Sequence, residues 1–369
     1  MEARCYGCHV AGGAGGFELN GWDKVQPLAA AVVNAVTTRK MPPWLADSAN
    51  CMKTRYDQRL TEAQLGLFKS WKDLGFPEGN AADFVAMTEE KPREVGAPTI
   101  VMKATRPVSL RAGAEWYECV VMQSVQTDTW VTAIQVVPDK DEYVHHAIVN
   151  VGNGACSALG ILAENVYSFR PGSQRLVFEE GDAMLIPAGK TIAVQHHYNT
   201  RFASASTTDQ SELHLWTLPA GQKPMRQISR MPNHDMLINI PVGAVNQREG
   251  EPASVTAAAG SEIIGISPHM HYLGQTFKET LSRRDGTEVC LVDIPDWDQD
   301  WQLDYFYKPE DYIKVVSGDT ANQTCMFSNR PEDQGKDPSG KPFTPQYTTY
   351  GEDTRQEMCL GYIWFRTPL

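Results

Sequence analysis

The sequence lacks any run that approaches the ~18 apolar residues of a transmembrane helix, and it has little positive charge. Its 33 Lys and Arg residues are outnumbered by 45 Asp and Glu residues, which gives a net charge of -12. The first absence argues against a membrane span, and the second argues against nucleic acid or an anionic membrane as a partner. The 42% hydrophobic and 21% charged content are those of a soluble globular protein, and 369 residues suffice for two or three domains.

Histidine is scarce, but six of the nine histidines fall in three clusters, namely His145-His146, His196-His197 and His269-Met270-His271. Imidazole suits copper, zinc and iron, whereas a thioether such as that of Met358 selects cuprous copper. Each cluster lies in or beside a strand-like run. A single histidine pair is as often a surface or core pair as a ligand pair, but three such clusters together predict one or two transition-metal sites.

A second motif, Cys5-Tyr6-Gly7-Cys8-His9, has the C-x-x-C-H spacing of c-type haem attachment, in which two thiols bind the porphyrin and the histidine binds iron. A thioredoxin-like redox pair is the alternative, but that motif needs no histidine and expects a βαβ context. A second axial ligand is then expected downstream. Met41, in a turn stiffened by prolines, is the candidate, although a lone methionine is usually core packing.

Haem attachment to this motif is a reaction of exported proteins, yet no secretory signal precedes Cys5. We therefore expect that a signal peptide, and with it the first cytochrome helix, has been removed, and that the protein is periplasmic or secreted. Eight cysteines fit an oxidising compartment, with two used by haem and six left for disulfides or burial.

The N-terminal part of the chain is predicted to be helical over residues 28–76. Thr61 is the expected N-cap of a helix in which Gln64 occupies the capping-box position. A polar stretch over residues 88–98 has the composition of a linker. We expect a small all-α haem domain over residues 1–87, followed by this linker.

From residue 99 onward, short β-type runs alternate with turns and show almost no helical periodicity. The expected strands are 116–122, 130–137, 143–151, 191–197, 212–218, 236–240, 262–266 and 362–365. This pattern predicts a mainly β protein with two antiparallel, jelly-roll-like β-sandwich domains. Their expected bounds are residues 99–218 and 219–369.

Residues 110–369 resemble the type II copper, ascorbate-dependent monooxygenases, the family of peptidylglycine α-hydroxylating monooxygenase and dopamine β-monooxygenase. Residues 1–85 resemble a class I-type cytochrome c domain instead. The segments that carry the copper-enzyme resemblance are Trp116-Tyr117-Glu118-Cys119, Val144-His145-His146, Val194-Gln195-His196-His197-Tyr198, His269-Met270-His271-Tyr272-Leu273-Gly274 and Glu357-Met358-Cys359-Leu360-Gly361-Tyr362.

The resemblance implies two copper sites with different tasks. The electron-transfer copper would be bound by three histidines, His145, His146 and His197. The copper at which dioxygen reacts would be bound by His269, His271 and Met358. An all-imidazole site tolerates both copper oxidation states, whereas the thioether site favours Cu(I). His196 replaces an aliphatic residue and is expected on the opposite strand face, so it is counted as structural, as is His214.

Several positions depart from the peptide-amidating member of the family. Its substrate-binding arginine corresponds to Ser267, and an amide residue is replaced by Leu360, whereas Tyr362 retains a tyrosine that faces substrate. Peptide amidation is therefore put in doubt.

The resemblance also bears on the cysteines. Cys325 and Cys359 match a family disulfide. Cys119 and Cys156 match half-cystines whose family partners are missing, so they are either free or paired differently.

The predicted function is a copper monooxygenase that hydroxylates a C-H bond of a small organic substrate with dioxygen. Its cofactors are two mononuclear coppers and haem c, its catalytic residues are His269, His271, Met358 and Tyr362, and its haem residues are Cys5, Cys8, His9 and Met41. Electrons would come through the cytochrome domain, from ascorbate, or from both. The alternative is a haem and copper electron-transfer or copper-binding protein without turnover. A zinc hydrolase fits less well because no carboxylate base stands beside the His-x-His motif.

Overall fold

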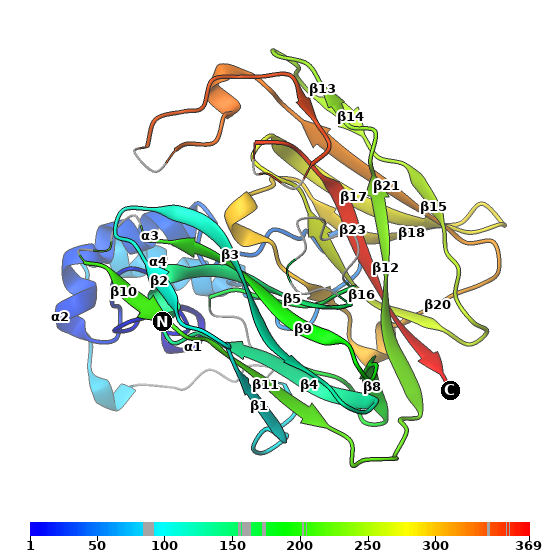
Figure 1. The fold of residues 1–369 in the computed structure, drawn as a ribbon. Helices are drawn as coiled ribbons and strands as arrows, with labels where there is room; N and C mark the ends of the chain where they lie inside the picture. Colours follow the sequence, from blue (N-terminus) through cyan, green and yellow to red (C-terminus); the bar gives the residue numbers. More distant parts are fainter. Residues whose placement is uncertain are drawn as a thin grey trace.

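The computed structural model describes residues 1–83, 92–153, 156, 164–171, 175–200, 203, 205–337, 340–351, 353 and 355–369. The described chain is mainly β, and its α-helices lie near the N-terminus (Figure 1). The α-helices are α1 (Glu2–Cys5), α2 (Trp22–Val25), α3 (Ala29–Thr37) and α4 (Glu62–Asp73). The 3-10 helices are η1 (Gln26–Leu28), η2 (Ala81–Asp83), η3 (Asp141–Tyr143), η5 (Gln299–Trp301), η6 (Pro309–Asp311) and η7 (Pro331–Asp333). The mainly β prediction is confirmed.

The helical region has its own small core. Buried side chains from this region pack together, namely Leu19, Val25, Val32, Val36 and Leu65. The capping box is confirmed, because Gln64 N donates to Thr61 Oγ1 at 3.2 Å while Thr61 N donates to Gln64 Oε1 at 2.8 Å. The expected boundary between residues 87 and 88 lies outside the described residues.

The prediction of helix over residues 28–76 holds for α3 and α4 but is wrong between them. Residues after Pro43 form no helix and run along the C-terminal half of the protein, where Trp44 and Met52 pack against its core. Asp47 N donates to Asp293 O at 2.7 Å, and Cys51 forms a disulfide with Cys290. Tertiary packing and the prolines therefore prevail over local helix propensity here.

The first β-sandwich packs a four-stranded sheet against part of a ten-stranded sheet. The four-stranded sheet has the order β3 (Glu115–Ser124), β9 (Thr191–Asn199), β5 (Val144–Gly152), β6 (Glu164–Phe169). The facing strands are β1 (Ile100–Lys103), β11 (Glu212–Thr217), β4 (Thr129–Val137), β7 (Leu176–Val177) and β8 (Asp182–Ile186). A small separate pair is formed by β2 (Val108–Leu110) and β10 (Thr207–Asp209). Alternate side chains of both sheets, such as Val120, Ile134 and Val149, fill the core between them.

The second sandwich uses the other part of the same ten-stranded sheet. Its strands there are β12 (Arg226–Asp235), β23 (Cys359–Pro368), β16 (Glu262–His269), β19 (Tyr305–Phe306) and β20 (Ile313–Lys314). They face a five-stranded sheet of β14 (Gln247–Glu249), β15 (Pro252–Ser254), β17 (Gly274–Ser282), β18 (Glu288–Ile294) and β21 (Thr320–Phe327). The last pair is β13 (Asn239–Ile240) with β22 (Thr348–Thr349). The two sandwiches are joined because β8 and β12 pair in parallel.

Seven of the eight expected strands lie within observed strands to within about one or two residues, the usual disagreement at strand ends. The strand expected over residues 236–240 is wrong, because β12 ends at Asp235 and only β13 (Asn239–Ile240) follows. The Asp235 carboxylate accepts a hydrogen bond from Leu237 N at 2.7 Å. This local side-chain bond turns the chain where apolar residues alone predicted a strand.

Six cysteines form three disulfides, and the other two, Cys5 and Cys8, are free thiols. The expected Cys325–Cys359 bond is confirmed. Cys119 and Cys156 pair with each other, which settles the alternatives that the sequence left open. Disulfides of this number are typical of an oxidising compartment. Within the described ranges, no helix is long and apolar enough to cross a membrane.

Candidate metal centres

His145, His146 and His197, here called the first histidine cluster, converge on one point. His145 and His146 lie on β5 and His197 lies opposite them on β9. Neighbouring residues of a regular strand point to opposite faces, but the β5–β9 register shifts between Val144 and His146. Such an irregularity re-aims side chains, and it lets two consecutive histidines reach the same site. The ligand atoms of the three rings all lie within 4.8 Å of one another.

The partners of this cluster fix which ring nitrogens carry hydrogen. His197 Nε2 lies 2.9 Å from Glu115 Oε1, and His145 Nε2 lies 3.4 Å from Asp300 Oδ1. A carboxylate accepts hydrogen bonds, so both Nε2 atoms are donors and both Nδ1 atoms carry lone pairs. These Nδ1 atoms lie 3.2 Å apart, and His146 Nδ1 is 3.3 Å from that of His145. Facing lone pairs at this distance fit a bound cation.

His269 and His271, here called the second histidine cluster, show the same arrangement at the end of β16. His269 Nδ1 lies 2.5 Å from Gln302 Oε1, and His271 Nδ1 lies 3.0 Å from the Gln356 carbonyl oxygen. Both Nδ1 atoms therefore donate, and the two Nε2 lone pairs face each other at 3.2 Å. With metal–nitrogen distances of about 2.0–2.1 Å, such a pair subtends about 100° at a metal, close to the tetrahedral angle.

Burial keeps these rings neutral. It lowers the pKa of His269 to about 3 and that of His271 to about 4, while the pKa of His146 falls well below its ordinary value. Metal ligands must be neutral imidazoles. His146, His269 and His271 are therefore in the neutral state that binds a metal at neutral pH.

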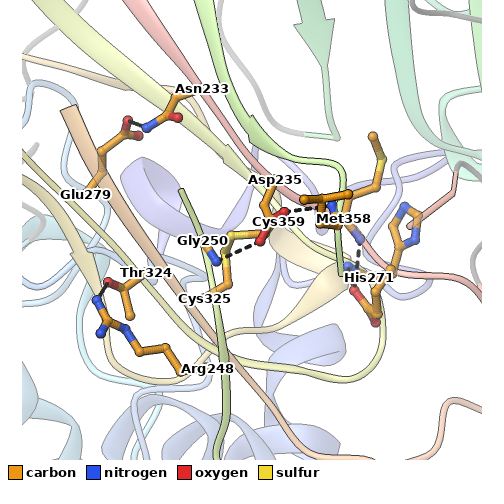
Figure 2. Close-up of a disulfide and its surroundings, with 12 residues drawn as sticks. Asn233, Asp235, Arg248, Gly250, His271, Glu279, Thr324, Cys325, Met358 and Cys359 are labelled. Atoms are coloured by element: carbon orange, nitrogen blue, oxygen red, sulfur yellow. Dashed lines mark hydrogen bonds between the residues drawn. A yellow bond between two sulfur atoms is a disulfide. The ribbon is translucent and has the colours of Figure 1, made fainter. Parts of the chain in front are cut away.

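A buried carboxylate, Glu357, joins the second cluster to Met358. Its oxygens accept hydrogen bonds from the backbone nitrogens of His271 at 2.8 Å, Leu273 at 2.6 Å and Met358 at 3.3 Å. Figure 2 shows the His271 and Met358 side chains on the same side of the Cys325–Cys359 disulfide. The Glu357 carboxylate thus fixes the backbone of both residues, and the disulfide holds Cys359 directly after Met358.

Tyr362 lies on the same sheet face as the second cluster. It pairs directly with Ser267 on β16, two residues from His269, and residues two apart share a strand face. The Arg230 guanidinium stacks over the Tyr362 ring at 4.0 Å. Ser267 donates to Asp304 and accepts from Trp364 Nε1 at 2.7 Å. The Ser267 side chain is therefore part of a buried hydrogen-bond network.

The other two histidines that we considered lie elsewhere. His196 is 1% exposed and stacks on Tyr198, on the face of β9 opposite His197. His214 lies on β11, where its Nε2 is 2.9 Å from Glu212. Their interpretation as structural residues remains a prediction.

The C-x-x-C-H residues fit a covalently attached haem. His9 Nδ1 lies 3.3 Å from the Phe17 carbonyl oxygen, so Nδ1 carries hydrogen and Nε2 is left for iron. A Cβ at Gly15 would lie 2.3 Å from His9 Nδ1, so only glycine allows this approach. Burial raises the pKa of Cys8 to about 11. A reactive redox thiol has a lowered pKa, so the thioredoxin-like alternative is disfavoured. Met41 follows α3, and its pairing with His9 remains a prediction.

The haem motif lies against the element that leads into the first cluster. The Asp141 carboxylate accepts a hydrogen bond from the Ala14 backbone, and its charge contributes to the raised pKa of Cys8. Asp141 belongs to η3, which is followed directly by β5 and His145. A Cβ atom at Gly12 would lie 3.4 Å from Oε2 of Glu142, which belongs to η3 like Asp141.

Sequence reasoning missed four residues that hold the histidines, namely Glu115, Asp300, Gln302 and Glu357. Glu115 directly precedes one quoted motif and Glu357 opens another, so their positions offered a signal although no role was given to either. Asp300 lies in η5 and Gln302 directly follows it, and neither has a motif around it in the sequence.

A comparison with curated proteins finds no match. Among solved structures, the chain is similar to the cowpea mosaic virus top component, with 8% identity over 79% of this chain and 95% of that chain and a TM-score of 0.29. It is also similar to broad bean stain virus, with 6% identity, the same coverages and a TM-score of 0.25. These likenesses are too weak to bear on function. Residues 251–369, which carry His269, His271 and Met358, match the model of the C-terminal domain of the copper type II ascorbate-dependent monooxygenases.

Proposed function

We propose that the protein is a copper monooxygenase that hydroxylates a C-H bond of a small organic substrate with dioxygen. The observation that carries this proposal is the second cluster, in which two Nε2 lone pairs face each other at 3.2 Å beside Met358. This cluster lies within the segment that matches the monooxygenase family model. When bound, copper supplies the reaction with dioxygen and the transfer of electrons.

The two clusters are proposed to hold one copper each. His145, His146 and His197 would hold the electron-transfer copper in the unit of residues 99–218. His269, His271 and Met358 would hold the dioxygen-reacting copper in the unit of residues 219–369. The soft thioether favours Cu(I). Tyr362, on the same sheet face as His269, is proposed to orient substrate.

The haem motif is proposed to be the electron entry. Cys5 and Cys8 would attach the porphyrin and His9 would bind iron, with Met41 as the second axial ligand. The contact of Ala14 with Asp141, four residues before His145, supports this route because it ties the motif to the helix η3 that leads into β5. Ascorbate is the alternative reductant. Haem maturation and the three disulfides both support a periplasmic or secreted location.

Met358→Ala tests the function. We expect it to abolish dioxygen uptake coupled to product formation while the first cluster retains copper, because those ligands lie in the other sandwich. Met326→Ala is the matched control, since Met326 is also half-buried and adjoins Cys325 of the same disulfide. A panel of amine, peptide and aromatic substrates should be screened with copper-loaded protein.

Full turnover per folded molecule of Met358→Ala would refute the oxygenase assignment. If the wild-type protein binds two coppers and reduces them but consumes no dioxygen with any substrate class, the electron-transfer alternative is correct. Copper stoichiometry and melting temperature should be measured on the same samples. A core methionine would instead show a loss of stability of about 2–5 kcal/mol with activity intact.

A further inference from the structure

One short stretch of chain, residues 300–304, touches both histidine clusters; here it is called the bridging segment. Its Asp300, Gln302 and Asp304 side chains alternate with Trp301 and Leu303. The segment is anchored at both ends. Trp297 N donates to Gln275 O at 2.8 Å before it, and Tyr305 pairs with Ile266 of β16 directly after it.

Asp300 serves the first cluster. Its Oδ1 lies 3.4 Å from His145 Nε2 on the side of the ring opposite the metal-facing Nδ1. Asp300 lies beyond β12 in the chain, whereas His145 belongs to the first sandwich. A residue of the second half of the protein therefore orients a ligand of the first.

Gln302 serves the second cluster. Its Oε1 accepts a hydrogen bond from His269 Nδ1 at 2.5 Å, and its own Nε2 donates to Gln299 O at 3.1 Å. That second bond fixes the amide orientation, so the oxygen faces the ring. His269 is thereby held with Nε2 toward His271.

Asp304 contacts residues of both halves of the protein. It accepts a hydrogen bond from Ser267, two residues before His269, and lies 3.7 Å from the buried Arg170 at the end of β6. Arg170 follows β6 of the first sandwich, so Asp304 contacts both halves of the protein.

We propose that Asp300 and Gln302 are positioning residues through which metal binding at one site changes the metal affinity of the other. The inference rests on the proposed copper sites. Residues two apart have Cα atoms no more than about 7 Å apart. A metal bound at the second cluster would fix the His269 ring, and with it the Gln302 side chain that contacts the ring. Because Gln302 is two residues from Asp300, this would also fix the position of Asp300 beside His145. Outer carboxylate and amide partners of ligating histidines typically change metal affinity by about 10- to 100-fold when removed.

The test measures copper binding and needs no turnover. Cu(I) affinities of the intact chain are determined by competition with a chromophoric chelator, and the Cu(II) sites are recorded by electron paramagnetic resonance. Asp300→Ala should weaken the first site by about 10-fold or more and raise its Cu(II)/Cu(I) potential, because a carboxylate partner increases imidazole basicity. Asp300→Asn keeps an acceptor oxygen and should recover most of the affinity. Asp296→Asn, an exposed change in the same loop, is the control.

The coupling between the two metal sites is measured with a double-mutant cycle. We expect removal of the second site by His271→Ala to weaken the first site by at least about fivefold, a usual size for coupling between sites. In a Gln302→Ala background that difference should disappear. The inference is overturned if Asp300→Ala changes first-site affinity, spectrum and potential no more than Asp296→Asn does, or if the His271→Ala effect persists without Gln302. A chain that binds two coppers with these properties but never hydroxylates substrate would refute the proposed function alone.

Discussion

Glu279 should make the folded protein less stable as the pH rises. Its side chain on β17 is fully buried, and burial raises its pKa to about 7, although a hydrogen bond from Asn233 Nδ2 at 2.9 Å opposes the shift. Figure 2 shows this pair apart from the disulfide. A Cβ at Gly361 would lie 2.3 Å from Glu279 Oε2, so the backbone of β23 covers this oxygen.

The direction of this pH effect follows from the pKa of Glu279 in the folded and unfolded states. In the unfolded chain the Glu279 pKa is near the ordinary 4.5, so the folded state holds the proton more tightly. The protein must therefore lose stability as the pH rises from about 4.5 to about 7, and the loss is complete above that window. A shift from 4.5 to about 7 corresponds to about 3 kcal/mol, of which about 2–3 kcal/mol falls between pH 5 and pH 8.

Glu279→Gln should remove this contribution because the amide does not titrate. The free energy of unfolding should be measured in urea at pH 5 and pH 8 with a metal chelator present, for the wild-type protein and the variant. The pH 5 to pH 8 difference should change by about 2–3 kcal/mol in the variant. Glu288→Gln, on an exposed position of the neighbouring β18, is the control and should behave as the wild-type protein. An identical pH dependence of the Glu279→Gln and wild-type proteins would refute the reasoning.

Three further predictions follow from the cysteines and from Met358. Protein matured in the periplasm should retain haem through an acid-acetone wash, and replacing Cys5 and Cys8 by Ser should release it into the extract. Removing the Cys51–Cys290 disulfide with the double alanine variant should cost about 5 kcal/mol in the chain-entropy model, since it closes a loop of 239 residues, and urea unfolding measures this. Met358→His should keep copper but shift the second site toward Cu(II), visible as a stronger Cu(II) resonance after partial reduction.

The sequence predicted the β character well because alternation and turn residues are local signals. It predicted which histidines cluster, but it could not predict how the adjacent His145 and His146 reach one site, since that depends on a register shift between β5 and β9. Strand alternation alone would have separated them.

The hydrogen-bond partners of the histidines could not be predicted from the sequence for a different reason. Asp300 and His145 are 155 positions apart, and nothing in a single sequence marks two such residues as neighbours. The non-helical path after Pro43 was missed likewise, because Asp293 on β18, which Asp47 contacts, lies far along the chain.

The parallel pairing of β8 with β12 means that the protein is not two separable modules. A fragment beginning at residue 251, where the family model begins, would lack β12 and so leave β23 without the partner that lines its whole length from Cys359 to Pro368. A long uncovered strand edge invites pairing with other chains. Attempts to express the C-terminal half alone should therefore include residues from Arg226 onward, and even then the side of β12 that meets β8 would be a site of self-association.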